Sequence, residues 1–501
     1  MQNISNEKTN KKEQCPIASK CGGCMGQKQS YEETLAAKQK NLSLLLKKFG
    51  KLSPIIGMEN PYNYRNKVHG VVSRDRKGNI FSGVYKEGTH IVVPVKECLI
   101  EDKRADKIMQ TICRLLKSFK IKVYDEDSGY GLVRHILVRT GHASGEVMVT
   151  LVTASPVFPS KNNFVKALRE IHPEVTTVVL NCNDRRTSMI LGDKEQVLYG
   201  KGYIEDTLCG KIFKISSKSF YQINSVQTEI LYRTVVDWAG LSGNETVIDA
   251  YCGIGTIALI AGDRAKRVIA VESNRDAVAD AIVNKKVNHS GNVEFYTQDA
   301  GVFMTGLAEQ KVKVDVLFMD PPRSGSTVEF IDAVKILAPQ RVVYISCNPE
   351  TLARDLAYFT KNIGYKVVKM QGIDLFPWTK HVETVVLLSK GAKGPVDLCS
   401  ARTEVERRLV DSRKVKVDFS LENMDLSEFK GKATYEQIKA YVLEQTGLKV
   451  SSLYIAQIKK KCGLDVGENF NLPKSENARQ PQCTPEKEEA IMQAFRHFGI
   501  V

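Results

Sequence analysis

The run Asp-Ala-Tyr-Cys-Gly-Ile-Gly-Thr-Ile-Ala at residues 249–258 is the strongest indication of the fold of the central part of the chain. It follows the apolar run 246–249 and contains a Gly-x-Gly-x-x-Ala turn, whose glycines permit a sharp bend and the close approach of a nucleotide. Glu272 closes the next apolar run, 268–271, about 20 residues after the turn, where an acid can bind ribose hydroxyls. By itself this pattern also suits a nicotinamide-dependent dehydrogenase.

Two further acids favour a different cofactor. Asp249 ends the strand before the glycines, and Asp299 follows a third strand-like run at residues 292–296. An acid after each of three successive strands suits a ligand that has free ribose hydroxyls, an adenine and an amino-acid tail. This outline matches S-adenosylmethionine, so we expect a Rossmann-like methyltransferase.

The pattern around this turn predicts an α/β domain. From Thr246 to Leu388, apolar strand-like runs alternate with helical segments, which predicts a parallel sheet with helices on both faces. Strands of such a sheet deliver binding groups at their carboxyl ends. We therefore expect Asp320, in Asp-Pro-Pro-Arg, and Cys347, in Ser-Cys-Asn-Pro, to converge with the acids of the turn.

Cys347 is a candidate nucleophile. It lies between a buried strand and a helix expected to begin near Pro349, because proline favours the first helical position. The unpaired amides and positive dipole end of that helix should lower the pKa of the thiol. The alternative is a small buried residue, since free cysteines are often inert in cores.

The chain is long enough for about three or four domains. We expect an N-terminal cysteine-cluster region at 1–100, an α+β insert at 101–205, the methyltransferase domain at 206–390 and a helical extension at 391–501. The insert contains a helix-like run, 105–119, and a linker is expected at 390–395. Helices expected at 434–447, 451–462 and 485–498 could form a helix-turn-helix with a basic second helix, or an appendage without a nucleic-acid role.

Composition narrows the class of protein. A net charge of +15 and an isoelectric point near 9.1 favour a polyanionic partner. The sequence has no apolar run of about 18 residues, and residues 1–14 lack the apolar core of a signal peptide, so we expect a cytoplasmic protein without a membrane partner. Twelve cysteines in such a chain favour metal binding, catalysis or burial over disulfides.

Three cysteines near the N-terminus have metal-site spacing. Cys15, Cys21 and Cys24 form a Cys-x5-Cys-x2-Cys pattern, and a fourth ligand must come from elsewhere, for which we choose Cys98. The spacing leaves both zinc and an iron-sulfur cluster open.

Five ordered motifs resemble those of the S-adenosylmethionine-dependent RNA uracil-C5 methyltransferases, in particular the 23S ribosomal RNA 5-methyluridine branch with an iron-sulfur cluster. They lie at residues 219–224, 249–256, 320–323, 346–349 and 381–384. The resemblance covers about residues 15–390 and leaves the C-terminal extension unexplained. It implies a class I methyltransferase domain, an N-terminal iron-sulfur region, and a four-iron, four-sulfur cluster on the four cysteines named above.

The resemblance also implies a role for each site residue. Cys347 matches the nucleophile that adds to carbon 6 of uracil, and Glu383 matches the general base that removes the proton on carbon 5. Without the resemblance, Glu383 would be read as an exposed carboxylate that opens the last strand. Residues that match cofactor-site positions are Gln222, Tyr251, Thr256, Glu272, Asp299 and Asp320, of which Asp320 could instead hold the uracil edge; relatives often have asparagine in place of Thr256.

The implied reaction is methylation of carbon 5 of a uridine in 23S ribosomal RNA, a step of rRNA processing, by a monomer. Two alternatives stay open: the same reaction on the T-loop of transfer RNA, and a non-catalytic RNA-binding assembly factor. The segment 62–67 interleaves aromatic residues with cations and predicts RNA contact, although it could also be a strand edge with solvated charges.

Overall fold

The computed structural model describes residues 15–24, 29–86, 88–185, 189–391, 435–446, 448–462 and 483–497. The chain divides into two compact units, Met1–Val410 and Asp411–Val501. Residues 1–14 and most of the expected linker, from Ala392 onward, lie outside the described residues.

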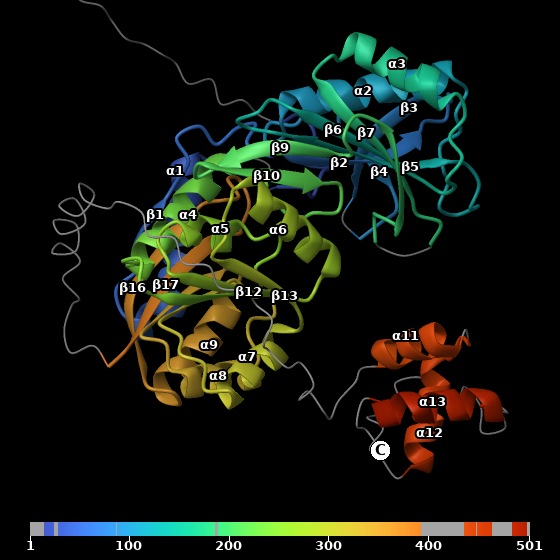
Figure 1. Ribbon diagram of the computed structural model, residues 1–501. Coiled ribbons are helices and arrows are strands. Elements are labelled where there is room, and N and C mark those ends of the chain that lie inside the picture. Colours follow the sequence, from blue (N-terminus) through green and yellow to red (C-terminus); the bar gives the residue numbers. More distant parts are fainter. Residues whose placement is uncertain are drawn as a thin grey trace, which may run out of the picture. The chain divides into compact units, whose positions relative to one another are not determined.

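An eight-stranded sheet is the larger of the two main sheets of the first unit (Figure 1), in the order β1-β16-β17-β15-β14-β11-β12-β13. Its strands are β1 (Ser53–Ile56), β11 (Thr246–Ala250), β12 (Arg267–Glu272), β13 (Val293–Thr297), β14 (Val316–Met319), β15 (Arg341–Ser346), β16 (Tyr365–Ile373) and β17 (Glu383–Lys390). The strands from β11 to β15 pair in parallel, as predicted.

β17 departs from the predicted parallel sheet, because it pairs antiparallel with both β15 and β16. The reason is the short connection 374–382 between β16 and β17. A parallel neighbour needs a crossover of about a dozen residues or more, usually through a helix.

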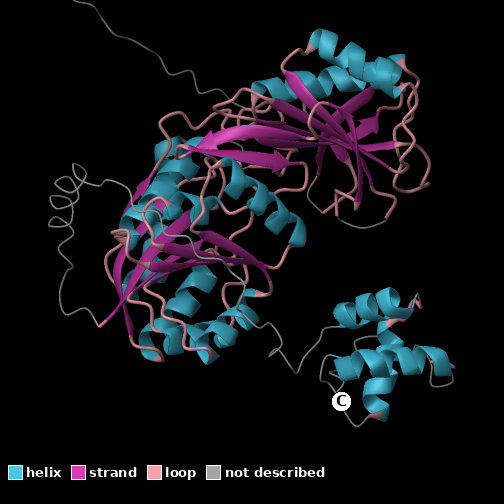
Figure 2. Cartoon of the chain, viewed as in Figure 1, coloured by secondary structure: helices cyan, strands magenta, loops and turns pink. Residues whose placement is uncertain are grey.

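Helices cover both faces of this sheet, as the sequence predicted (Figure 2). Alternate strand residues point to opposite faces, so Val247 joins one core with the helices α4 and α5, and Ile248 joins the other with α7, α8 and α9. The helices are α4 (Ser225–Ala239), α5 (Thr256–Gly262), α6 (Arg275–Val287), α7 (Ala300–Glu309), α8 (Val328–Leu337) and α9 (Pro349–Lys361).

The N-terminal part of the chain does not form a region of its own up to residue 100. The helix α1 (Tyr31–Leu46) buries Leu42 and Leu46 in a core of the eight-stranded sheet, and β1 pairs in parallel with β16. The four residues of β1 have no alternating pattern, so their long-range pairing left no signal in the sequence.

A second sheet of seven strands has the order β4-β3-β2-β5-β6-β7-β8 and carries α2 (Lys103–Ser118) and α3 (Lys161–Ile171) against one apolar core. Its strands are β2 (Lys67–Arg74), β3 (Ile80–Tyr85), β4 (Val92–Pro94), β5 (Val133–Thr140), β6 (Val147–Thr153), β7 (Val175–Cys182) and β8 (Lys194–Tyr199). Strands from before and after residue 100 share this sheet, so the expected boundary at residue 100 falls inside it. β9 (Tyr203–Leu208) and β10 (Lys211–Ser216) form a separate two-stranded ribbon.

The second unit contains the helices α11 (Tyr435–Thr446), α12 (Ser452–Lys461) and α13 (Pro485–His497). They share a core that includes Ile438, Ile455 and Phe495. Three short amphipathic helices were predicted here and are confirmed, except that Thr434, Gly447 and Phe498 lie outside the described residues.

The glycine turn yields a stability prediction. Gly255 has φ +83° at the start of α5, and a Cβ there would lie 2.5 Å from the Phe295 ring. We expect Gly255→Ala to lower the free energy of unfolding by about 2 kcal/mol, from left-handed strain and overlap together. Gly291→Ala is the matched control, since a Cβ at Gly291 meets nothing within 4 Å. Equal thermal midpoints for the two variants would contradict this prediction.

Candidate active site

The strand register brings the predicted catalytic residues to one edge of the eight-stranded sheet. Ser346 pairs with Thr384 across the antiparallel strands β15 and β17. Cys347 comes directly after Ser346 and Glu383 directly before Thr384, so both lie at the same end of the two strands. Met319 pairs with Tyr344 and with Ala250, which puts Asp320 at this edge beside the glycine turn. Because β17 is antiparallel, its first residue lies where the parallel strands end.

Glu383 and Asp320 form an acidic pair in which Glu383 is buried and Asp320 is partly exposed. Glu383 is only 3% exposed, so the alternative of an exposed carboxylate at the strand start is wrong. Burial raises its pKa to about 8, the negative charge of Asp320 adds to this rise, and Arg323 opposes it. Burial also raises the pKa of Asp320 to about 7. Near neutral pH the two carboxyls therefore titrate as one system that retains a proton.

Cys347 lies at the predicted helix start, because α9 begins at Pro349. The expected low pKa of the thiol is nevertheless wrong. Burial raises the pKa of Cys347 to about 11, Glu383 and Asp320 raise it further, and Arg323 acts in the opposite direction. The side chain of Asn348 already accepts a hydrogen bond from the Glu350 amide at 3.1 Å. Burial, together with two nearby carboxyls, thus raises the pKa of this thiol in spite of its place at a helix start.

The glycine turn and the acids after it form the expected cofactor end of the cleft. Glu272 accepts hydrogen bonds from the amides of Gly253 at 3.2 Å and Asn274 at 2.8 Å, which fixes its carboxylate beside the turn. Asp299 caps α7 by accepting from the Gly301 amide at 2.9 Å. The ring of Tyr251 lies 5.5 Å from that of Phe330. These contacts hold predicted cofactor residues in place from both sides of the turn.

Tyr232 is a residue of this cleft that the sequence did not reveal. Its hydroxyl accepts a hydrogen bond from Thr256 at 3.4 Å. Burial raises the pKa of this phenol, Asp320 raises it further, and hydrogen bonds with Thr256 and Gln222 oppose the rise. A tyrosine on the core face of a helix usually has only a packing role. The place of Tyr232 in the site is therefore recognised only from its neighbours in the structure.

Asp249 gives this edge of the sheet a buried carboxyl group without a hydrogen-bond partner among the described residues. It is 1% exposed, and both carboxyl oxygens lack a hydrogen-bond partner among the described residues. Burial raises its pKa well above the usual range, and Asp320 and Glu272 add to the rise. S-adenosylmethionine carries a sulfonium and an ammonium group, so a cleft lined by these carboxylates suits its charge.

The aromatic and basic segment 62–67 meets the cleft from the seven-stranded sheet. The Asn66 side chain donates to the carbonyl of Gln222 and to the hydroxyl of Ser225, at 3.0 Å each. Burial lowers the pKa of Lys67 to about 8, and the positive charges of Arg139 and Arg65 lower it further. RNA contact by this segment stays a prediction.

The four expected metal ligands are not assembled as a site. No group of three or more His, Cys, Asp or Glu side chains suited to a metal ion occurs among the residues that the structure describes. Cys24 and Cys98 nevertheless pack against the same apolar cluster of Tyr64, Ile100 and Trp378. Two of the four thiols therefore lie against one surface, which is compatible with a shared ligand.

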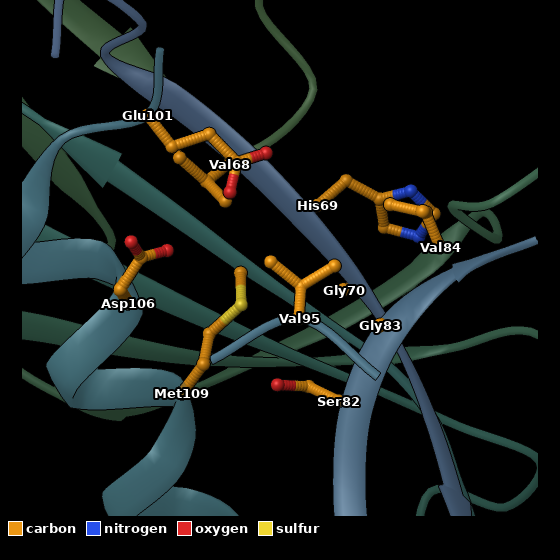
Figure 3. A pocket seen from close by; sticks show the side chains of 10 residues that line it. All are labelled: Val68, His69, Gly70, Ser82, Gly83, Val84, Val95, Glu101, Asp106 and Met109. Atoms are coloured by element: carbon orange, nitrogen blue, oxygen red, sulfur yellow. The ribbon is translucent and has the colours of Figure 1, made fainter. Parts of the chain in front are cut away.

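A separate pocket lies in the seven-stranded sheet (Figure 3), and the predicted catalytic and cofactor residues do not line it. Glu101 and Asp106 lie toward one end and His69 toward the other. Burial and Asp106 raise the pKa of Glu101 to about 7, and burial raises that of Asp106 to about 6. The backbone amide of Cys98 donates to Asp106 at 2.9 Å, which connects this acidic pair to a predicted metal ligand.

A largely parallel sheet, a glycine turn followed by acids, and a Cys-Glu pair at the same edge define a Rossmann-like methyltransferase. The sequence matches the family described as tRNA (Uracil-5-)-methyltransferase over residues 30–391, so the chain belongs to this family. Membership makes it an RNA methyltransferase of the uracil-5 class, and its fold implies dependence on S-adenosylmethionine.

Individual relatives agree with this assignment. An uncharacterized RNA methyltransferase of Halalkalibacterium halodurans is 41% identical over 379 residues, which span 75% of this chain and 82% of the relative. One from Caldanaerobacter subterraneus is 43% identical over 380 residues, covering 75% and 84%. The crystal structure of Pyrococcus abyssi tRNA (uracil-54, C5)-methyltransferase with S-adenosyl-L-homocysteine has a TM-score of 0.62 at 26% identity, covering 73% and 86%. No helix in the described ranges is long and apolar enough to cross a membrane.

The buried Glu383 predicts a pH-dependent stability. Its pKa near 8 in the folded chain lies above its usual value of 4.5, so its contribution to stability is complete below pH 4.5 and is lost as pH rises toward 8. We expect Glu383→Gln to raise the melting temperature at pH 9, by an amount equivalent to a few kcal/mol at about 1.4 kcal/mol per pKa unit, and to change it little at pH 4.

Glu309→Gln is the matched control for this prediction, because Glu309 is an exposed carboxylate on α7. It should change the melting temperature equally little at both pH values. A Glu383→Gln variant that melts below the wild type at pH 9 would contradict the raised pKa.

Proposed function

We propose that this enzyme transfers a methyl group from S-adenosylmethionine to carbon 5 of a uridine in 23S ribosomal RNA, in the cytoplasm and as a monomer. The observation that carries the proposal is the register of β15 and β17, which puts Glu383 beside Cys347 with Asp320 at the same edge. A thiol and two carboxyl groups at one edge of the sheet suit chemistry on a pyrimidine ring.

The proposed reaction begins with addition of the Cys347 thiolate to carbon 6, because carbon 5 of uracil is too weak a nucleophile by itself. The π electrons of the double bond between carbons 5 and 6 move toward the ring carbonyl, and Asp320, at the same edge of the sheet, would hold the uracil edge by a hydrogen bond. Carbon 5 of this enolate would then take the methyl group from the sulfonium sulfur of the cofactor, which keeps the electrons of the broken bond and would leave as S-adenosylhomocysteine. Ionised Glu383 removes the remaining proton on carbon 5, the double bond re-forms, and the Cys347 sulfur leaves as thiolate.

The cofactor contacts proposed for this chain follow the resemblance residue by residue. Tyr251 would contact the methionyl part, Glu272 the ribose and Asp299 the adenine. Gln222 and Thr256 would lie beside the cofactor, and both form hydrogen bonds with Tyr232. S-adenosylmethionine would supply an electrophilic methyl group on its sulfonium sulfur. Asp249 would balance its positive charge, since this carboxylate has no other hydrogen-bond partner among the described residues.

The choice of RNA has one specific alternative. The Pyrococcus abyssi relative is a methyltransferase of uracil 54 in transfer RNA, which favours a tRNA substrate. The early cysteine cluster favours the 23S ribosomal RNA branch instead, because the tRNA branch usually lacks it. A non-catalytic assembly factor is the weaker reading, since it would not need Cys347, Asp320 and Glu383 together.

We also propose a four-iron, four-sulfur cluster on Cys15, Cys21, Cys24 and Cys98, with zinc as the alternative. The shared apolar surface of Cys24 and Cys98 supports this ligand set. The cluster would join the N-terminal segment to the seven-stranded sheet, which we propose as an RNA-binding part. For the second unit, a helix-turn-helix role of α11 and α12 stays a proposal.

The first test compares RNA labelling by the wild type and Cys347→Ala, with radioactive cofactor and separated ribosomal and transfer RNAs. We expect the wild type to label 23S ribosomal RNA and the variant to label at least about 10³-fold less, because the covalent route is lost. Cys182→Ala, at the end of β7, is the control and should label normally. Labelling confined to transfer RNA would overturn the substrate, and equal labelling by Cys347→Ala would overturn the mechanism.

The second test concerns the metal. Protein purified without oxygen should absorb broadly near about 400 nm, and Cys98→Ser should lose this absorption while Cys182→Ser keeps it. Stoichiometric zinc without the absorption would replace iron and sulfur by zinc in the proposal.

A further inference from the structure

The connection between β16 and β17, residues 374–382, ends at the proposed base. Ile373, the last residue of β16, pairs with Glu383, the first residue of β17. The conformation of the connection therefore determines the position of Glu383. Within it, Trp378 has φ +66°, which is rare and costly for a bulky side chain. A strained backbone at this place must be held by contacts from elsewhere.

The first set of contacts is a buried ion pair with α1. Lys38 donates to Asp374 at 2.7 Å, and the two side chains are 4% and 0% exposed. Tyr31 donates to the other oxygen of Asp374 at 2.8 Å, and Lys38 also donates to the carbonyl of Phe376 at 3.0 Å. The side chains of α1 thereby contact both the side chain of Asp374 and the backbone of Phe376 at the start of the connection.

The second set surrounds the strained residue. The indole nitrogen of Trp378 donates to the carbonyl of Pro61 at 2.9 Å, and the residue is 4% exposed. Its ring lies 5.5 Å from the rings of both Tyr31 and Tyr62. Tyr31 therefore contacts both Asp374 and Trp378, which couples the two sets.

Two more hydrogen bonds hold the backbone between these points. Tyr64 donates to the carbonyl of Pro377 at 2.9 Å, and Asn224 donates to the carbonyl of Leu375 at 3.1 Å. Asn224 caps α4, the helix that carries Tyr232. Elements distant in sequence thus fix the connection over its first half.

We propose that Lys38, Asp374, Tyr31 and Trp378 form a clamp that positions Glu383 for proton abstraction from carbon 5. The clamp residues are positioning residues, and the inference rests on the function proposed above. A buried ion pair contributes little net stability in many proteins, whereas loss of one partner is severe. Its value here lies in specifying one conformation of the connection.

The step that depends on the clamp is release of the methylated base. The Glu383 carboxylate takes the proton from carbon 5, the electrons of that C–H bond form the double bond between carbons 5 and 6, and the Cys347 sulfur departs with the electrons of its bond to carbon 6. Addition and methyl transfer use Cys347 and the cofactor instead. A loosened clamp should therefore leave methylated RNA attached to the protein.

The test measures the denaturant-resistant RNA–protein adduct, kcat and S-adenosylhomocysteine affinity for Asp374→Asn, with the wild type and Glu383→Gln as references. We expect kcat to fall about 10-fold or more, because small displacements of a reacting group slow a reaction strongly. The adduct should accumulate as it does in Glu383→Gln, and the affinity should change less than about twofold. Tyr365→Phe is the matched control, since it removes a buried hydroxyl hydrogen bond at the far end of β16; it should accumulate no adduct.

A second variant guards against misfolding. Lys38→Met combined with Asp374→Leu removes both buried charges, so it should fold while still lacking the clamp and accumulating adduct. Normal release by both clamp variants would overturn the proposal. The proposal would also be overturned if adduct and product both fell in the clamp variants in proportion to the folded fraction. A purely structural role of these residues predicts that result.

Failure of the proposed function would look different. A wild type that neither labels RNA nor forms an adduct would refute the methylation chemistry itself. In that case the clamp is tested by tryptophan fluorescence. The chain has only two tryptophans, so in a Trp238→Phe background the emission comes from Trp378 alone. Asp374→Asn should shift this emission to longer wavelength, and an unchanged spectrum would overturn the clamp.

Discussion

The antiparallel pairing of β17 with β15 is the constraint on which the site depends. The parallel strands deliver Asp249, Asp320 and Cys347 at their carboxyl ends, and a parallel last strand would have delivered Glu383 at the opposite edge. The short connection from β16 enforces the reversal. The proposed nucleophile and the proposed base thus meet because two strands are joined too closely for a crossover.

Burial then decides the charge of the cleft. Asp249, Asp320, Glu383 and Cys347 all have raised pKa values, because a low-dielectric site disfavours several negative charges together. A cation bound among them favours the ionised forms. In the proposed reaction, the positive charge of the sulfonium would therefore favour the ionised form of the Cys347 thiol.

The positions of these groups are maintained by segments distant in sequence. Helix α1 reaches Asp374, the segment 61–64 reaches Trp378 and Pro377, and Asn66 reaches Gln222. The N-terminal residues therefore support the methyltransferase sheet as well as the seven-stranded sheet. The match to the family spans residues 30–391 and so includes both sheets.

Much of the fold follows from local pattern. The glycine turn, the start of α9 at Pro349 and the alternation of strands and helices were predictable, since turn geometry, helix capping and side-chain period depend on adjacent residues. Only the tertiary structure decided that β1 joins the eight-stranded sheet, that Tyr232 lines the cleft and that the pKa of Cys347 is raised. These pairing, burial and charge interactions join residues that are 24 positions apart for Tyr232 and Thr256 and more than 300 apart for β1 and β16, and no local pattern in a single sequence records them.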